Sequence, residues 1–208
     1  MTQKLIIQTT VNTAEETAAG ATTNSTQFIA GTDSRTADSM FRVTPTLAAG
    51  IAGAISATGV DGLETGHGIE AADLVGVSWL AATRYHITVD TATANAIVFD
   101  DTPTAGGDAL PAEETAVIVS VETSLDIAGD GDQVQAFAVS CDQAANVRWL
   151  ESDGTVIWEI ELTAGVPYAW VESGPVANPL TGNPWSEIVA VNRTTTAANL
   201  ELSILYDA

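Results

Sequence analysis

The regular spacing of short runs with alternating apolar and polar residues, in the last third of the chain, constrains the fold most strongly. In residues 155–162 large apolar side chains take every second position, and Glu159 and Glu161 lie between them. A period of two is typical of a strand with one buried face. Between two of the runs, the residues ESDGT predict a tight hairpin turn with Asp153 and Gly154 at its tip. The spacing predicts a β-sandwich of six strands, at residues 134–140, 146–151, 155–162, 168–172, 187–192 and 199–206.

Four more runs rich in β-forming residues precede the sandwich and predict a meander or a small barrel, at residues 74–80, 84–90, 95–100 and 115–121. In the second run, Ile87 and Val89 alternate with polar residues that include His86. The pattern therefore predicts that His86 is a surface histidine on the solvated face of its strand. Residues 47–59 are apolar but small, and their interpretation stays open between a strand pair and a short helix.

The N-terminal segment differs from the rest of the chain. Residues 4–11 predict a strand, and residues 40–46 a second one. Residues 12–39 between them are mostly Thr, Ala, Gly, Asn and Ser, interrupted by Phe28 and Ile29, and predict an extended arm or a long loop. The fold class is therefore predicted to be all-β: a small β-barrel-like module followed by a C-terminal antiparallel β-sandwich, jelly-roll-like, with an extended N-terminal arm. The predicted segments are residues 1–58 for the strand and arm, 59–125 for the barrel and 126–208 for the sandwich.

The charge of the chain limits its partners. The chain has 27 acidic and six basic residues, which gives a net charge of -21. A surface of this kind repels nucleic acid and stays hydrated, so no nucleic acid partner is expected. No stretch has the apolar length of a membrane span, and the N-terminus lacks the apolar core of a signal peptide, which predicts a soluble protein made in the cytoplasm. The single cysteine, Cys141, predicts a buried thiol and no internal disulfide.

Catalytic and metal-binding patterns are weak in this sequence. Asp126, Asp130 and Asp132 lie close together, but neither of the last two starts a calcium loop that ends in the required Glu, so an acidic turn between the modules is favoured and cation binding stays open. The residues that zinc prefers, His67, His86 and Cys141, are scattered. We expect no metal, no cofactor and no enzymatic activity, although a carboxylate pair for glycoside cleavage stays an alternative.

The tryptophans fall into two groups. Trp79, Trp149 and Trp158 lie in predicted strands and are expected in the core. Trp170 and Trp185 flank a proline-rich crossover and are expected at a surface, where a large ring contributes most to contact with a glycan or another subunit. The interface candidates are therefore these two and two residues of the arm, namely Phe28, Ile29, Trp170 and Trp185.

Two stretches carry a resemblance to a known class of protein, VRWLESDGTVIWEIELTAGVPYAWV and ADLVGVSWLAATRYHITVDTATANAIVFDD. The first resembles small β-sandwich modules, and the second small barrel-like modules, in virion structural proteins of tailed bacterial or archaeal viruses. The likeness covers about residues 60–206 and lies in the rhythm of strands and turns, so it transfers no functional residues.

This resemblance implies a non-enzymatic external capsid decoration or stabilising protein. Such a protein would bind the major capsid protein or other virion proteins on the outer surface of the virion, after assembly in the host cytoplasm, and would form a homo-oligomer, for which we expect a trimer. A neck or tail accessory protein and a carbohydrate-binding sandwich module are the alternatives.

Overall fold

The computed structural model shows an all-β protein, as the sequence predicts. It describes residues 3–16, 22–37, 39–56, 58–79, 83–100, 114–172 and 176–206. Within these residues the one helix is a short 3-10 turn, η1 (Gly131–Gln133), and every other regular element is a strand. None of the helical structure described has the length and apolar character that a membrane span needs.

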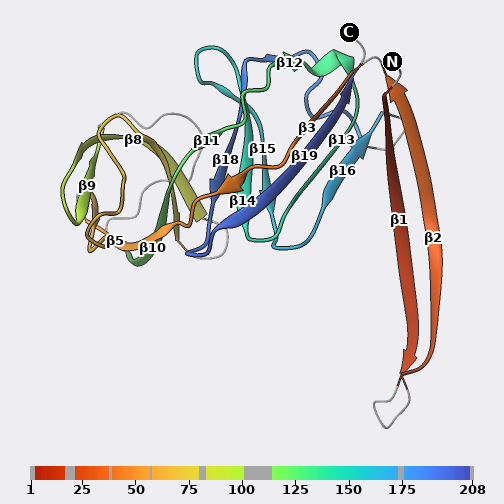
Figure 1. The fold of residues 1–208 in the computed structure, drawn as a ribbon, viewed down its shortest axis with the longest axis horizontal. Coiled ribbons are helices and arrows are strands. Elements are labelled where there is room, and N and C mark those ends of the chain that lie inside the picture. The colour runs from red at the N-terminus through yellow and green to blue at the C-terminus, as the bar shows by residue number, and fades with distance from the viewer. Residues whose placement is uncertain are drawn as a thin grey trace.

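Six antiparallel strands close into a small barrel, in the order β10-β5-β6-β9-β8-β7 (Figure 1). Closure leaves the barrel without a free edge, and its interior is filled by aliphatic side chains such as Val60, Val75 and Val119, none of which is exposed. The segment whose interpretation stayed open forms a strand pair, β5 and β6. The barrel strands are β5 (Ile51–Ile55), β6 (Gly59–Asp61), β7 (Leu74–Trp79), β8 (Thr83–Ala92), β9 (Ala96–Phe99) and β10 (Glu114–Val121).

Two antiparallel sheets form the sandwich. One has the order β11-β18-β14-β15, and the other the order β16-β13-β19-β3, with β4 also paired to β19. A short pair, β12 (Gly129–Asp130) and β17 (Pro184–Trp185), closes one end. The first sheet consists of β11 (Thr123–Ser124), β14 (Ala145–Leu150), β15 (Val156–Leu162) and β18 (Glu187–Asn192). The second consists of β3 (Ser39–Val43), β4 (Thr46–Leu47), β13 (Val134–Cys141), β16 (Tyr168–Val171) and β19 (Ala198–Tyr206).

Aromatic rings fill the core between the two sheets. Phe137 and Trp149 are completely buried, with ring centroids 6.0 Å apart, and Trp158 lies 4.7 Å from Trp149. Aliphatic side chains of β19, Leu200, Leu202 and Ile204, close the core from the second sheet. The alternating pattern of the last third of the chain therefore identified the buried face correctly.

The barrel packs against the outer face of the first sheet. All six residues of β14 are buried, although only alternate ones face the core, because the barrel covers the other side. Gly76 of β7 lies so close to β18 that a Cβ there would meet Val191 Cγ1 at 2.5 Å. The Ser120 hydroxyl donates to the carbonyl of Asn192 at 2.5 Å, and the Gly50 amide donates to the carbonyl of Thr194 at 2.8 Å. The two modules thus share a packed and hydrogen-bonded junction.

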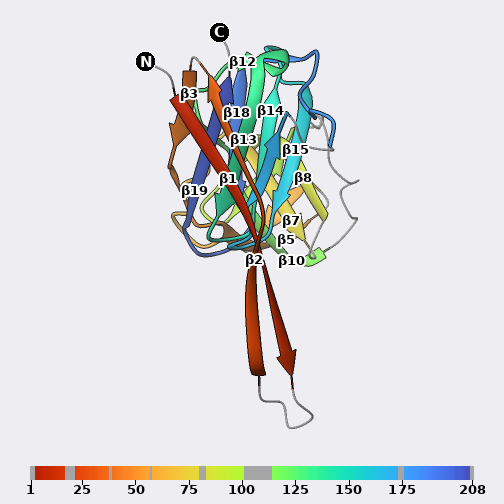
Figure 2. The same cartoon turned by 90° about the vertical axis from the view of Figure 1, so that its right-hand side faces the viewer.

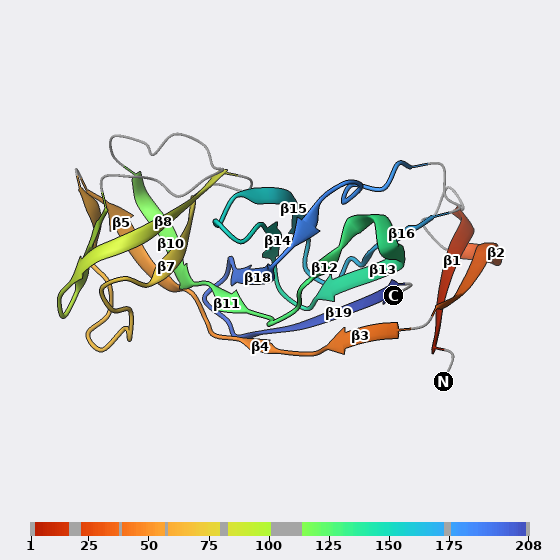
Figure 3. The same ribbon diagram turned by 90° about the horizontal axis from the view of Figure 1, so that it is seen from above.

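The N-terminal segment is a long β-hairpin rather than one strand followed by a loop. Strands β1 (Gln3–Glu16) and β2 (Thr22–Ala37) pair antiparallel from Gln3↔Ala37 to Glu16↔Thr22 and form a sheet of their own. The base of the hairpin contacts β3, β13 and β19, and its far half extends past the body of the molecule (Figures 1 and 2). Viewed from above in Figure 3, the hairpin lies at the end of the sandwich opposite the barrel.

The predicted segment boundaries differ from those of the structure. Residues 39–47 belong to the sandwich, because β3 and β4 pair with β19, while β5 already belongs to the barrel. The boundary at residue 58 therefore falls inside the barrel. The boundary at residue 125 falls inside the sandwich, because β11 pairs with β18. The chain forms sandwich strands first, then the barrel, and then returns to the sandwich. Sequence patterns carry little information on such long-range strand pairing.

Candidate functional site

A cluster of buried charged side chains lies at the junction between the modules. His86 comes from β8 of the barrel, Glu122 from the link between β10 and β11, and Arg148 from the outer face of β14. His86 is 2% exposed and Arg148 is 3% exposed, and the side chain of Glu122 is 4% exposed. Ionised groups are almost never buried to this degree unless they are paired.

Glu122 holds this cluster together. Its Oε1 accepts a hydrogen bond from Arg148 Nη1 and lies 2.8 Å from His86 Nδ1. Since an ionised carboxylate only accepts, Nδ1 is the nitrogen that donates. On the other side of the ring, His86 Nε2 lies 3.5 Å from Glu159 Oε1, and this same oxygen accepts from Asn146 Nδ2 at 2.7 Å. The cluster connects the barrel, the link and two strands of the sandwich.

The prediction that His86 is a surface histidine is wrong. The alternation along β8 separated two faces correctly, since Ile87 and Val89 point into the barrel. The outer face is covered here by the sandwich, and no local pattern shows what covers the outside of a barrel. Arg148 was not singled out, although it lies within the apolar run Val147–Leu150 and is one of only five arginines. A single arginine within an apolar run is the sequence feature that indicates a buried charge here.

A cavity of about 170 Å³ lies beside the cluster. Glu122, Arg148 and Leu150 form its buried part, and Leu74 stands at its rim with 38% of its surface exposed. The exposed β14–β15 hairpin, with Asp153, Gly154 and Thr155, also lines the cavity. Arg148 Nε is buried and has no hydrogen-bond partner among the described residues.

The hairpin turn beside this cavity has the geometry that its sequence predicts. Gly154 adopts a φ of 85°, which favours glycine, and Asp153 Oδ1 accepts from the Thr155 amide at 2.9 Å. This hydrogen bond holds the pKa of Asp153 below its ordinary value, so the carboxylate at the cavity rim is ionised at neutral pH.

Hydrogen bonds and ion pairs define the chemistry of this cluster. Both nitrogens of His86 face carboxylates, whereas a nucleophilic triad needs a hydroxyl or thiol beside the imidazole. In the part of the chain that the structure describes, no group of three or more His, Cys, Asp and Glu side chains is placed to hold a metal ion. Arg148 and its carboxylate partner Glu122 both line the small cavity, so hydrogen-bonding groups are available there.

The predicted surface position of Trp170 and Trp185 is wrong. Trp170 is 5% exposed, stacks on Phe137 at 6.0 Å and donates from Nε1 to the carbonyl of Val176 at 2.9 Å. Trp185 is 4% exposed and packs against Gly129, where a Cβ would lie 2.4 Å from the ring. Both rings belong to the hydrophobic core of the sandwich, so neither offers a platform for a glycan.

The remaining aromatic candidates are distributed as follows. Trp149 is confirmed as a core residue, and Trp158 is partly buried against the same core. Phe28 and Ile29 lie in β2, and their side chains are outside the described part of the chain, as is the side chain of Trp79.

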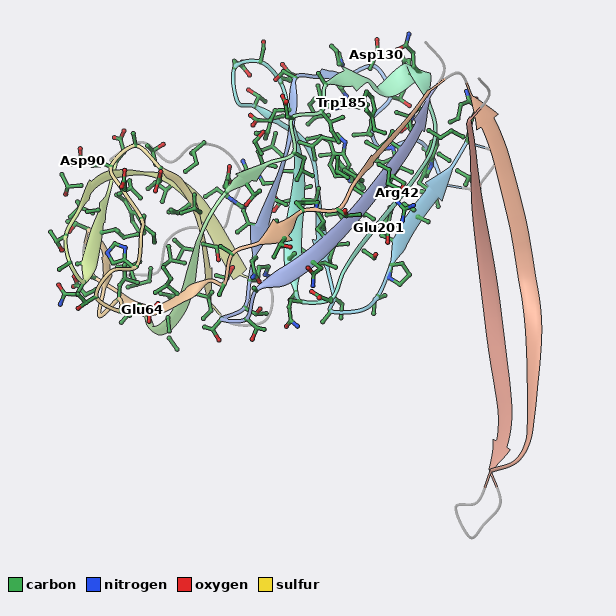
Figure 4. All side chains as sticks on the ribbon, in the orientation of Figure 1. Arg42, Glu64, Asp90, Asp130, Trp185 and Glu201 are labelled. Atoms are coloured by element: carbon green, nitrogen blue, oxygen red, sulfur yellow. The ribbon has the colours of Figure 1, made fainter. Side chains whose placement is uncertain are left out.

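The aspartate cluster organises a turn inside the sandwich, not between the modules. Asp130 Oδ1 caps η1 by accepting from the Asp132 amide at 3.0 Å, and Asp132 Oδ1 accepts from the Gly182 amide at 2.8 Å. Figure 4 shows Asp130 and Trp185 at the same end of the sandwich. Cys141 is buried, as predicted, and burial raises the pKa of its thiol.

Comparison of the chain with models of protein families, with characterised proteins and with solved structures gave no match.

Proposed function

We propose that this chain is a non-enzymatic structural protein that assembles with neighbouring copies of itself, using the β1–β2 hairpin as an arm, and decorates the outside of a larger particle. The observation that carries the proposal is the hairpin itself. It forms a two-stranded sheet that extends beyond the body, and no third strand of the described chain pairs with either of its edges.

An isolated two-stranded ribbon is a poor structure in water. Strand β1 has 14 residues, and at about 3.3 Å per residue a ribbon of this size is about 45 Å long. Ribbons of two strands are marginally stable by themselves, and their outer edges carry unpaired N–H and C=O groups. Docking against another subunit satisfies these groups by strand addition and buries the apolar residues of the arm, which include Phe28 and Ile29.

The distribution of charge supports the arm as the contact. Residues 41–208 contain 23 of the 27 acidic residues and only four of the six basic ones. Two such bodies repel each other at low ionic strength. The first 40 residues hold four acidic and two basic residues. This segment therefore approaches a second acidic body with the least electrostatic repulsion. An acidic exterior also suits a position away from a packaged genome.

The finer assignment, an external capsid decoration protein of a virion, rests on the resemblance of the two modules to virion structural proteins. The major capsid protein and sibling copies are the partners that this assignment proposes. The carbohydrate-binding alternative that relied on Trp170 and Trp185 loses its basis, because both rings are buried.

Sedimentation velocity over a range of concentrations tests the proposal. High salt is used to screen the electrostatic repulsion between the acidic bodies. We expect the full chain to form a defined oligomer and a chain lacking residues 1–38 to sediment as a monomer that still unfolds in one cooperative transition. Val166 is 55% exposed on the body, so Val166→Asp is the matched control and should assemble like the parent chain. A full chain that stays monomeric throughout, or a truncated chain that still assembles, would refute the proposed role of the arm.

A further inference from the structure

The cavity at the junction between barrel and sandwich has a mixed polar and apolar lining, which assembly through the β1–β2 hairpin does not require. It combines an apolar wall, from Leu74 and Leu150, with a polar floor, from Glu122 and Arg148. Leu74 is one of the large apolar side chains that the body exposes, and it stands at the rim of this cavity. Arg148 and Glu122 are both almost completely buried and are paired through Arg148 Nη1, so they form one ion-paired polar part of the cavity lining.

The size of the cavity indicates what fits. In another protein a cavity of about 150 Å³ holds a benzene ring, whereas one water molecule needs about 30 Å³. The volume here, about 170 Å³, therefore accommodates a single six-membered ring or several waters. The exposed Asp153–Thr155 turn gives access from solvent.

The charges of the lining determine the class of ligand. The lining carries two carboxylates, Glu122 and Asp153, and one guanidinium, which disfavours an anion. A cation finds Glu122 already paired with Arg148, and Asp153 Oδ1 already accepting from the Thr155 amide. A neutral molecule that carries hydroxyl groups both accepts from Arg148 and donates to the carboxylates. Its C–H surface suits the leucine wall. From this complementarity we propose that the junction cavity is a binding site for one small polyhydroxylated molecule, a monosaccharide unit or polyol, oriented by Arg148 and Glu122.

This site is independent of the arm and of the buried tryptophans. It takes the sugar at the seam between the two modules, where the ligand touches the barrel through Leu74 and the sandwich through Leu150 and the β14–β15 turn. Binding at such a seam stabilises the contact between the modules, because a ligand that prefers the native state shifts unfolding.

The full chain, labelled with ¹⁵N, should be titrated with D-glucose, D-galactose and glycerol and observed by NMR. We expect saturable shifts of the Gly154 and Thr155 amide signals, because both residues line the cavity. Sodium acetate and guanidinium are the anionic and cationic comparisons and should leave these signals unchanged at equal ionic strength.

Leu74→Trp closes the rim without touching the ion pair and should weaken binding by about tenfold or more, a loss of about 1.4 kcal/mol. Val166→Trp adds the same ring to an exposed position of the sandwich and should bind like the parent chain. Absence of shifts with all three neutral compounds overturns the proposal. A response to acetate or guanidinium but not to the sugars overturns the assigned ligand class, and equal binding by Leu74→Trp overturns the location.

Discussion

Removing the positive charge of Arg148 should destabilise the protein strongly. The side chains of Arg148 and Glu122 are both 4% exposed, so solvent screens their interaction very little. Arg148→Met keeps an unbranched stem in the sheet but leaves Glu122 buried with His86 as its remaining partner. Breaking a buried ion pair from one side typically costs about 3–5 kcal/mol, and we expect a loss of this size in the free energy of unfolding.

Urea denaturation measures this loss, and a double-mutant cycle assigns it to the pair. Glu122→Leu alone should be about as damaging, whereas Arg148→Met with Glu122→Leu should cost less than the sum, with a coupling energy of about 2–3 kcal/mol. The exposed pair Arg42–Glu201 is the control (Figure 4), with a separation of 2.6 Å and side chains 61% and 50% exposed. Arg42→Met should cost less than about 1 kcal/mol. Equal losses at Arg148 and Arg42, or additive effects in the cycle, would refute the reasoning.

Two further predictions concern the sandwich. In Gly131→Ala the new Cβ would lie 1.7 Å from the carbonyl oxygen of Leu180, so backbone has to move, and the free energy of unfolding should fall by about 1–3 kcal/mol; an unchanged urea midpoint would contradict the close approach. The backbone amide and then the side-chain amide of Asn199 donate to the Asp142 carboxylate, both at 2.7 Å, and hold the pKa of Asp142 below its ordinary value. Because the folded pKa is lowered, this stabilisation is present above about pH 4 and is lost as the pH falls through the folded value. The melting temperature of Asp142→Asn should therefore fall less steeply with acid than that of the parent chain, and parallel curves would count against the carboxylate's role.

Most of the longer strands of both modules were predictable because their signals are local. The alternation around Trp158 and Ile160 marks a face, and the residues Asp153 and Gly154 mark a turn, whatever the rest of the chain does. The hairpin strand β2 was missed for the opposite reason. Threonine, serine and asparagine give no contrast in hydropathy, although threonine favours extended backbone.

The junction cluster was not predictable from local pattern. Glu122 and Arg148 are far apart from His86 in the chain, and they meet only because the barrel docks on the outer face of β14. Trp170 and Trp185 were misplaced because their flanking prolines indicate an exposed crossover, while Trp170 in fact stacks on Phe137 and Trp185 packs against Gly129 of β12. Burial that depends on how two modules pack is visible only in the structure.

Hydrogen exchange of the β1–β2 amides, compared between the dissociated chain and its assembled form, tests the role of the arm most directly. Amides that point away from the β1–β2 ladder have no partner strand in the described chain, and they should exchange freely in the monomer and become protected on assembly. Amides of the barrel core should be equally protected in both. An arm whose outward amides exchange at the same rate in the two forms would contradict the claim that it docks on a neighbour.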